Sequence, residues 1–235
     1  MSILRLLKYP NKSHRKTIKI PEESADLAEL IGAIAGDGGV SNWQVIISLN
    51  SITDLRYAHF IMNLFEKLFG IKPTARKRIG QNCIVVDCSS RNITDFLIEK
   101  GVVKGHKIKH RLNIPSWILL KADYKVAFLR GLFDTDGCTF IDHHQNKAKI
   151  YGNIGLAFTN YSLPLLESIN QILRELGYSP TITTRFRVLL RRESEVFRFF
   201  REFSPNNERH YDKLREFLEE YRSGCNGTVS KAVVG

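Results

Sequence analysis

The feature of this 235-residue sequence that most constrains its fold is an internal duplication. The turn Leu-Phe-Gly-Ile-Lys-Pro-Thr at residues 68–74 is matched by Glu-Leu-Gly-Tyr-Ser-Pro-Thr at residues 175–181, an offset of 107 positions. Two similar helix endings, at Asp37 and Asp136, are 99 positions apart. Because solenoid repeats are roughly 20 to 50 residues long, a repeat of this size indicates two similar half-domains in one chain.

Each half has the pattern of helix, hairpin, helix, hairpin and helix. The first helix is expected to begin after the capping residue Ser24 and to end at Gly36. Residues 43–49 alternate between apolar and polar, which predicts a half-buried strand, and residues 59–69 form an amphipathic helix that closes on glycine. A second helix, which Asp123 can cap, opens the same order in residues 122–222. The sequence therefore predicts an α+β fold made of two pseudo-twofold related αββαββα half-domains.

The same patterns set the expected boundaries. We predict a basic N-terminal arm, a first half-domain, a linker, a second half-domain and a mobile tail of small polar residues, at residues 1–23, 24–105, 106–121, 122–222 and 223–235. Aromatic side chains pack in cores more often than they stack on bases, so Trp43 and the group Phe197, Phe199 and Phe200 are assigned to the core.

The charge of the chain favours a polyanionic partner. There are 35 Lys and Arg against 24 Asp and Glu, which gives a net charge of +11 and a pI near 9.6. Nucleic acid suits this balance better than a membrane surface or a small-molecule substrate. No run of 18 apolar residues and no apolar signal segment are present, so we expect an intracellular chain, in a prokaryotic cytoplasm or an organelle interior.

Small residues predict where the two halves meet. They stand four positions apart on each glycine-ending helix, so they share one face and permit close backbone contact: Gly32 and Gly36 on the first, Gly131 and Thr135 on the second. Asp37 and Asp136 directly follow these stripes, so packing the stripes together brings both carboxylates to one end of the helix pair. Two neighbouring acids in a basic protein need a cation, and Mg²⁺ suits carboxylate, water and phosphate oxygens. Paired metal ions of this kind cleave phosphodiesters.

At these helix ends the chain resembles the LAGLIDADG homing endonucleases in their single-chain form with two motifs. The resemblance rests on Leu-Ile-Gly-Ala-Ile-Ala-Gly-Asp-Gly at residues 30–38 and Leu-Arg-Gly-Leu-Phe-Asp-Thr-Asp-Gly at residues 129–137. It extends over about residues 24–222, since the repeat also follows the family's half-domain order. The first copy has Ala35 where the family name has its first Asp, a position that is usually dispensable.

The resemblance implies a fold, an activity and a metal. Two antiparallel sheets would form a saddle on a long, asymmetric site in double-stranded DNA, with the motif helices at the central interface, and cleavage would leave staggered ends. The family's metal-binding acid precedes the final glycine, which places the role on Asp37 and Asp136 and not on Asp134. Together with the preceding Gly36 and Thr135, they would hold two or three Mg²⁺ ions, with Mn²⁺ able to substitute.

Further site residues are expected on the strands. The family places polar or basic residues around its metals at the end of the second strand and after the fourth, and the matching residues here are Asn50, Asn160, Arg91 and Arg192. Alternation along the strands suggests a basic sheet surface that follows phosphates and reads the major groove. Its predicted DNA-binding residues are Gln44, Ser48, Arg76, Arg78, Thr139, Arg185 and Arg187.

Three functions remain open: a DNA endonuclease, an RNA maturase that assists intron splicing, and a DNA-binding regulator with an inactive site. Two carboxylates near phosphate repel the substrate unless a metal is bound, so their presence favours cleavage. His143 and His144 near Asn146 could suggest a His-Asn nuclease motif, but no second set of ligands accompanies them. We expect a monomer that binds double-stranded DNA and could also bind intron RNA, encoded by an intron or similar mobile element.

Overall fold

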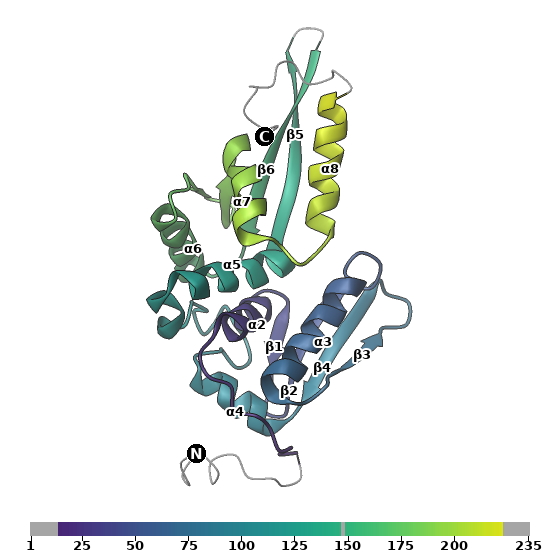
Figure 1. Ribbon diagram of the computed structural model, residues 1–235, viewed down its shortest axis with the longest axis vertical. Coiled ribbons are helices and arrows are strands. Elements are labelled where there is room, and N and C mark those ends of the chain that lie inside the picture. Colours follow the sequence, from purple (N-terminus) through teal and green to yellow (C-terminus); the bar gives the residue numbers. More distant parts are fainter. Residues whose placement is uncertain (1–13, 147–148, 223–235) are drawn as a thin grey trace.

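The computed structural model describes residues 14–146 and 149–222, and the structural statements below concern these residues (Figure 1). The first thirteen residues of the predicted basic arm and the predicted mobile tail at residues 223–235 lie outside the described ranges. The first half consists of α2 (Ala25–Ala35), β1 (Gly38–Val40), β2 (Gln44–Asn50), α3 (Leu55–Phe69), β3 (Thr74–Lys77), β4 (Cys83–Ser89) and α4 (Arg91–Glu99).

The second half repeats this order after a short 3-10 helix, η1 (Ser116–Leu120), in the predicted linker. Its elements are α5 (Ala122–Asp136), β5 (Gly137–Asn146), β6 (Lys149–Thr159), α6 (Leu163–Glu175), β7 (Thr181–Thr183), β8 (Arg187–Leu190) and α7 (Glu193–Phe203), followed by α8 (Arg209–Arg222). In the described ranges, no helix combines the length and the apolar composition needed to cross a membrane.

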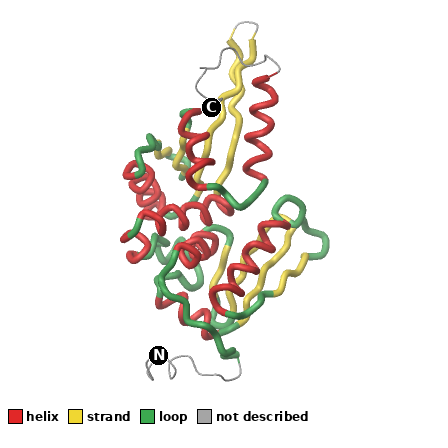
Figure 2. The backbone as a smooth tube through the Cα atoms, in the orientation of Figure 1, coloured by secondary structure: helices red, strands yellow, loops and turns green. Residues whose placement is uncertain are grey.

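The two halves have the same sheet topology. Each has four antiparallel strands, in the order β1-β2-β4-β3 in the first sheet and β5-β6-β8-β7 in the second. Figure 2 shows these as two separate sheets, with α2 and α5 between them. The predicted α+β fold with two αββαββα half-domains is confirmed. Helix α8, which lies beside β5 in Figure 1, has no counterpart in the first half, so the repeat did not predict it.

Each sheet has a closed face and an open face. On β2, Val45, Ile47 and Leu49 are buried against the helices, whereas Gln44, Ile46 and Ser48 are partly exposed on the other side. This is the half-buried strand expected from strict alternation. The prediction for Trp43 is wrong: its side chain is 48% exposed and lies outside the core, whereas Phe199 and Phe200 are buried as expected.

Helices α2 and α5 pack through their glycines in a reciprocal way. A Cβ atom at Gly32 would overlap the carbonyl oxygen of Phe128, and a Cβ atom at Gly131 would overlap the carbonyl oxygen of Glu29. Gly32 and Gly131 are 99 positions apart, and so are Glu29 and Phe128. This is the offset that also separates the two acids, so the two contacts are equivalent, as a pseudo-twofold crossing requires. Helix backbones approach this closely only where side chains are absent.

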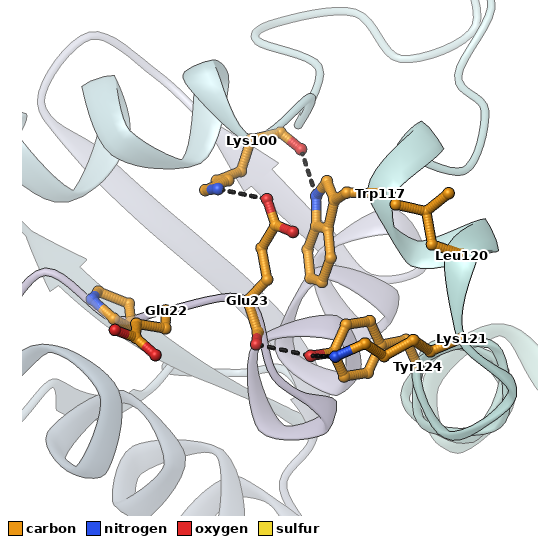
Figure 3. A pocket seen from close by; sticks show the side chains of 8 residues that line it. Glu22, Glu23, Lys100, Trp117, Leu120, Lys121 and Tyr124 are labelled. Carbon is orange, nitrogen blue, oxygen red and sulfur yellow. Dashed lines mark hydrogen bonds and ion pairs between the residues drawn. The ribbon is translucent and has the colours of Figure 1, made fainter.

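The linker is attached to the beginning of both motif helices, around the pocket drawn in Figure 3. The Trp117 indole N–H donates to the carbonyl of Lys100 at 3.1 Å, and the Tyr124 hydroxyl donates to the carbonyl of Glu23 at 2.7 Å. Lys100 also forms an ion pair with the Glu23 carboxylate at 2.6 Å. These contacts hold the halves together at the helix ends remote from Asp37 and Asp136.

Candidate metal centre and DNA-binding surface

The two expected metal-binding acids stand at the same end of the α2–α5 pair. Asp37 directly follows Gly36, which caps α2, and Asp136 is the last residue of α5. A Cβ atom at Gly36 would lie 3.3 Å from the Cγ atom of Asp136 and would overlap the side chain of Thr135. The absence of a side chain at Gly36 therefore allows the two carboxylates to approach each other.

Burial and mutual repulsion perturb both acids. The pKa of Asp136 is raised to about 6, first because the carboxyl is buried and second because the charge of Asp37 is close; a hydrogen bond from Asn160 acts in the opposite direction. Burial also raises the pKa of Asp37, against the attraction of Arg209 and Lys107. Ionisation of these two buried carboxylates is therefore unfavourable in the metal-free protein, and a bound cation would stabilise their charged forms.

Two basic side chains that sequence reasoning missed lie on the carbonyl ends of the motif helices. The Lys107 ammonium donates to the carbonyl of Ala35 at 3.0 Å and also to that of Gly36. The Arg209 guanidinium donates to the carbonyl of Thr135 at 2.5 Å. Cations are favoured at helix C-termini, where carbonyl oxygens lack intrahelical partners. Each motif helix therefore ends in one carboxylate and receives one cation.

A signal for these two residues was present in the sequence. Lys107 and Arg209 are 102 positions apart, within the offsets of 99 to 107 that relate the other duplicated features. Burial lowers the pKa of Lys107, while the charges of Asp136 and Asp37 oppose this effect. The ammonium is therefore held near two carboxylates in a partly desolvated position.

The two asparagines expected near the metals differ in their contacts. The Asn160 side-chain amide donates to an Asp136 carboxylate oxygen at 2.9 Å, so the structure brings these residues together. The Asn50 side-chain oxygen Oδ1 instead accepts from the backbone N–H groups of Ile52 and Thr53 at 2.8 and 3.2 Å. Asn50 stabilises the turn before α3 and has no such bond to Asp37. Its direct role at the metal centre stays a prediction.

The predictions that Arg91 and Arg192 lie beside the metals are wrong. Arg91 begins α4, directly beyond the end of β4 at which Ser89 pairs with Gln44. Asp37 lies beside Ser48, since its carbonyl accepts from the Ser48 N–H at 3.1 Å, and the strand from Ser48 to Gln44 spans roughly 13 Å. Arg91 is therefore at the outer end of the sheet.

Arg192 is displaced from the acids in a similar way. It lies at the start of α7, where its guanidinium donates to the Ser179 hydroxyl at 2.7 Å and contacts Glu195 at 3.3 Å. The spacing from each Arg to the following Phe correctly marked equivalent positions in the two halves. Spacing along the chain does not tell which end of a sheet a residue occupies.

Several of the expected DNA-binding residues share an open sheet face. Ser48 pairs with Val85, which pairs with Arg76, so their side chains lie on the same side as Gln44. Arg78 extends this row, because its N–H donates to the Cys83 carbonyl one step beyond β3. The first half therefore presents a polar and basic strip on one face.

The second half presents a similar face with two changes from the expectation. Arg187 pairs with Thr159 and Thr183 on the open face. Arg185 is exposed but lies in the turn between β7 and β8, not on a strand face. The prediction that Thr139 contacts DNA is wrong: it pairs with Leu156 on the closed face and is 5% exposed.

Asp134 has a structural role, in agreement with its expected exclusion from the metal site. Its buried carboxylate accepts from the backbone N–H groups of Asn206 and Asn207 at 2.9 and 3.1 Å. Asn207 also donates to the Asp54 carboxylate at 3.1 Å, which in turn contacts Arg209 at 3.3 Å. The segment between α7 and α8 thereby connects the metal end of α5 to the first half-domain.

The donor set fits hard divalent cations. The described part of the chain holds no group of three or more His, Cys, Asp or Glu side chains placed to bind one ion. The two carboxylates and the carbonyl oxygens of Gly36 and Thr135 supply only oxygen donors, which Mg²⁺ and Mn²⁺ accept with water and phosphate completing the shell. A zinc-type site with nitrogen and sulfur donors does not fit.

The raised pKa of Asp136 predicts a pH-dependent stability difference between the metal-free wild type and Asp136→Asn. The folded protein retains a proton on Asp136 up to about pH 6, whereas the unfolded chain loses it near the ordinary aspartate pKa of 3.8. The unfolded state therefore binds fewer protons in this window, and the contribution of Asp136 to stability falls as the pH rises. The quantity to measure is the free energy of unfolding of both proteins in urea with EDTA. Between pH 4 and pH 7 this free energy should rise by about 2 kcal/mol in Asp136→Asn relative to the wild type.

The comparison with the variant is needed because His210 acts in the opposite direction. Burial lowers the pKa of His210 to about 3, so its contribution to stability rises with pH over part of the same range. Both proteins contain His210, and its effect cancels in the difference. An unchanged difference between pH 4 and 7 would show that the Asp136 pKa is not raised.

One family model, together with curated proteins and solved structures, matches the chain. Residues 123–203 match the model described as a LAGLIDADG-like domain. The alpha subunit NrdEB of ribonucleoside-diphosphate reductase from Bacillus subtilis (strain 168) is 25% identical over 170 residues. Reverse gyrase of Methanocaldococcus jannaschii is 26% identical over 177 residues. The matches cover 67% and 74% of this chain but only 15% and 10% of those two proteins.

The solved structures similar to this chain include homing endonucleases and meganucleases. I-LtrWI, described as a LAGLIDADG homing endonuclease bound to target DNA, matches 87% of this chain and 94% of its own, with a TM-score of 0.57 and 10% identity. I-SmaMI, bound to uncleaveable DNA, matches 86% and 98%, with a TM-score of 0.56 and 12% identity. I-DmoI, in complex with DNA and Mn, matches 76% and 96%, with a TM-score of 0.50 and 19% identity.

These matches agree with the duplicated order of elements, the reciprocal glycine contact and the paired acids. The structural matches extend over both halves, whereas the family model covers the second motif helix and the elements that follow it. The chain therefore has the two-motif fold of the single-chain LAGLIDADG homing endonucleases, and its second half carries a LAGLIDADG-like domain.

Proposed function

We propose that this chain is a site-specific DNA endonuclease that uses divalent metal ions to cut both strands of a long, asymmetric site, leaving staggered ends. The observation that carries the proposal is the meeting of Asp37 and Asp136, one from each half, at the end of a helix pair between two open sheets. Similar structures described as DNA complexes support a duplex as the substrate.

The chain's own residues have separable roles in this proposal. Asp37 and Asp136, with the carbonyls of Gly36 and Thr135, would hold the metal ions. Bound divalent ions supply an activated water and stabilise the leaving oxygen in phosphodiester hydrolysis. Asn160 fixes the orientation of the Asp136 carboxylate through its 2.9 Å hydrogen bond. We propose two or three ions, Mg²⁺ by preference with Mn²⁺ as a substitute; the Mn complex of I-DmoI supports divalent metal use.

Lys107 and Arg209 offset the negative charge of the acids. Without them, two buried carboxylates would repel an approaching phosphate, so their position allows the DNA backbone to come close. If the carbonyl oxygens of Gly36 and Thr135 bound metal ions, the Lys107 and Arg209 groups that donate to them in this structure would be freed to contact the substrate. We propose that both act as electrostatic groups in catalysis.

Substitution of Lys107 by methionine should therefore slow cleavage by about 10², the usual effect of removing one preorganised donor from a reacting site. The matched control is Lys109→Met, which removes an exposed lysine from the same linker. Single-turnover cleavage rates at saturating enzyme measure the effect apart from DNA affinity. Equal rates for the two variants would exclude a catalytic role for Lys107.

The open sheet faces would hold the duplex. Their exposed polar and basic side chains can contact phosphates and the edges of bases in the major groove. The proposed DNA-binding residues are Gln44, Ser48, Arg76, Arg78, Arg185 and Arg187. Because both halves belong to one chain, we propose a monomer with one asymmetric site. Similar segments within two differently named enzymes support an origin from a mobile element.

The test is cleavage of a plasmid library that carries randomised sequences and candidate intron-insertion sites, with Mg²⁺ or with EDTA. We expect cutting at one long site with Mg²⁺ and none with EDTA. Sequencing of the cut ends would show whether they are staggered. Specific binding to DNA or intron RNA without cleavage would contradict the endonuclease and support a regulator or a maturase.

A further inference from the structure

The outer end of the first sheet carries a pocket that the metal centre does not use. It has a volume of about 560 Å³ and is lined by His14, Lys16, Trp43, Gln44 and Ser89, which we call the outer pocket. Gln44 pairs with Ser89 on the open face of the sheet. The outer pocket therefore opens on the same side as the proposed DNA-binding residues.

Trp43 is held at this pocket by contacts of its ring with Arg91 and His14 and not by burial in the core. The Arg91 guanidinium lies 5.3 Å from the centre of its ring, and the His14 ring centre lies 5.4 Å away. Arg91 is also 3.8 Å from the Asp95 carboxylate, and its side chain is 43% exposed. Trp43 thus orients a cation at the pocket, while nearly half of its own surface stays open to a partner.

The segment before α2 is fixed against the first residues of α4. The Arg15 guanidinium donates to the side-chain oxygen of Asn92 and pairs with Asp95, both at 2.8 Å. The Arg91 N–H donates to the carbonyl of His14 at 2.7 Å. The Asn92 side-chain amide also donates to the carbonyl of Lys16 at 2.9 Å. These contacts fix the backbone at Lys16 and at the two residues before it, next to the pocket that Lys16 lines.

The charges at the outer pocket favour an anion. Lys16 is exposed and forms no ion pair within residues 14–146 and 149–222, and Arg91 adds a second positive charge. Two acids are close: the Asp87 carboxylate accepts from the Ser89 hydroxyl at 2.7 Å, and the Asp95 carboxylate pairs with Arg15 and Arg91. The three cations Arg15, Lys16 and Arg91 outnumber these two acids. The remaining polar groups of the lining, from His14, Gln44 and the Trp43 indole, can each donate a hydrogen bond.

The two halves differ in how far their first hairpin extends. β1 and β2 pair over three residues, whereas β5 and β6 pair over ten. At about 3.3 Å per residue the second hairpin is longer by roughly 23 Å. Figure 1 shows the β5–β6 hairpin reaching one end of the molecule, while α4 and the purple segment that precedes α2 lie towards the other end. The outer pocket stands where a longer first hairpin would continue.

We propose that the outer pocket binds a backbone phosphate of the DNA flank, beyond the base pairs that the strands of the first half can reach. The proposal rests on the proposed function, since it extends the DNA-binding surface of the same enzyme. Lys16 and Arg91 supply the charge, Trp43 packs against the sugar-phosphate backbone, and the contact carries no sequence information. The first half thereby compensates for its short hairpin.

The experiment uses the full chain and a duplex that contains the cleaved site, shortened one base pair at a time from either end. Dissociation constants are measured in EDTA for the wild type, Lys16→Gln and Trp43→Ala. As the duplex is shortened from one end, the affinity of the wild type should fall about five- to tenfold on removal of one particular base pair. A fall of the same size should occur when the duplex is shortened from the other end. Both variants should lack this fall at one end only, and Lys16→Gln should reduce the salt dependence by about one counterion.

Lys67→Gln is the matched control, because it removes one lysine from α3, on the closed face of the same sheet, where Lys67 pairs with Asp26. It should keep both falls in affinity. Variants that follow the wild type at both ends would overturn the outer pocket and leave the endonuclease intact. A wild type that cuts no duplex would overturn the proposed function itself, and with it the pocket. Thermal unfolding of each variant verifies that it is folded.

Discussion

Replacing Asp136 by asparagine should reduce double-strand cleavage by a factor of about 10³ or more, while duplex binding in EDTA stays equal or becomes tighter. The substitution keeps the size of the side chain but removes one of the two carboxylates that would hold the metal. Loss of about 4 kcal/mol of transition-state stabilisation corresponds to this factor. Binding does not suffer, because a buried negative charge near phosphate is lost. Asp37→Asn should behave in the same way.

Asp134→Asn is the matched control for this experiment. Asp134 stands two positions before Asp136 on the same helix, but its carboxylate is fully buried and accepts two backbone N–H groups. The variant should cut at a rate within about threefold of the wild type. It should be less stable, because the asparagine side chain has one acceptor oxygen where the carboxylate uses two. If Asp134→Asn loses cleavage and Asp136→Asn keeps it, the assignment of the metal ligands is wrong.

Replacing Gly131 by alanine should lower the free energy of unfolding by about 3 kcal/mol or more. In an isolated helix the same change is favourable by about 1 kcal/mol, because alanine restricts the unfolded chain. Here the added methyl would overlap the carbonyl oxygen of Glu29, so α2 and α5 must separate along their whole contact. The sign of the effect therefore distinguishes interface packing from helix propensity.

Gly39→Ala is the control for the glycine prediction. A Cβ atom at Gly39 would meet only the Ile46 side chain, at the ordinary distance of 3.5 Å, and its effect on stability should stay within about 1 kcal/mol. Urea midpoints of the two variants, measured in EDTA, give the comparison. Equal stability of the two alanine variants would mean that the helices are not in close contact through Gly131.

The fold was predictable because duplication and periodicity are local properties of the chain. The alternation in residues 43–49 correctly predicted which side chains of β2 face the helices, from Val45 to Leu49. The small-residue stripes predicted the α2–α5 contact from spacing alone, because only glycine permits helix backbones to lie this close. At the edges of the sheets, local sequence patterns predicted burial less well. Trp43 is largely apolar, yet its contacts with the Arg91 guanidinium and the His14 ring hold it at the surface.

The rest of the candidate metal centre depends on which distant segments of the chain fold back onto the ends of α2 and α5. Lys107 lies in the connection after α4 and Arg209 begins α8, and no local pattern shows that they reach the carbonyl ends of α2 and α5. The opposite error occurred for Arg91 and Arg192. Their spacing in the sequence matches that of site residues, but both lie away from the two acids. Side-chain periodicity assigns a residue to a face, whereas its distance from a site is set by strand register.

The attachment of Arg209 to the end of α5 has a consequence for the order in which the protein is made. Thr135, which receives the guanidinium, leaves the ribosome 74 positions before Arg209. Both carboxylates therefore emerge well before the second cation that balances them, and the asparagines that anchor Asp134 arrive only with that late segment. During synthesis the two acids of the proposed metal centre are therefore present before the contacts that complete their surroundings, so the centre can form only when residues 206–209 have folded back onto α5.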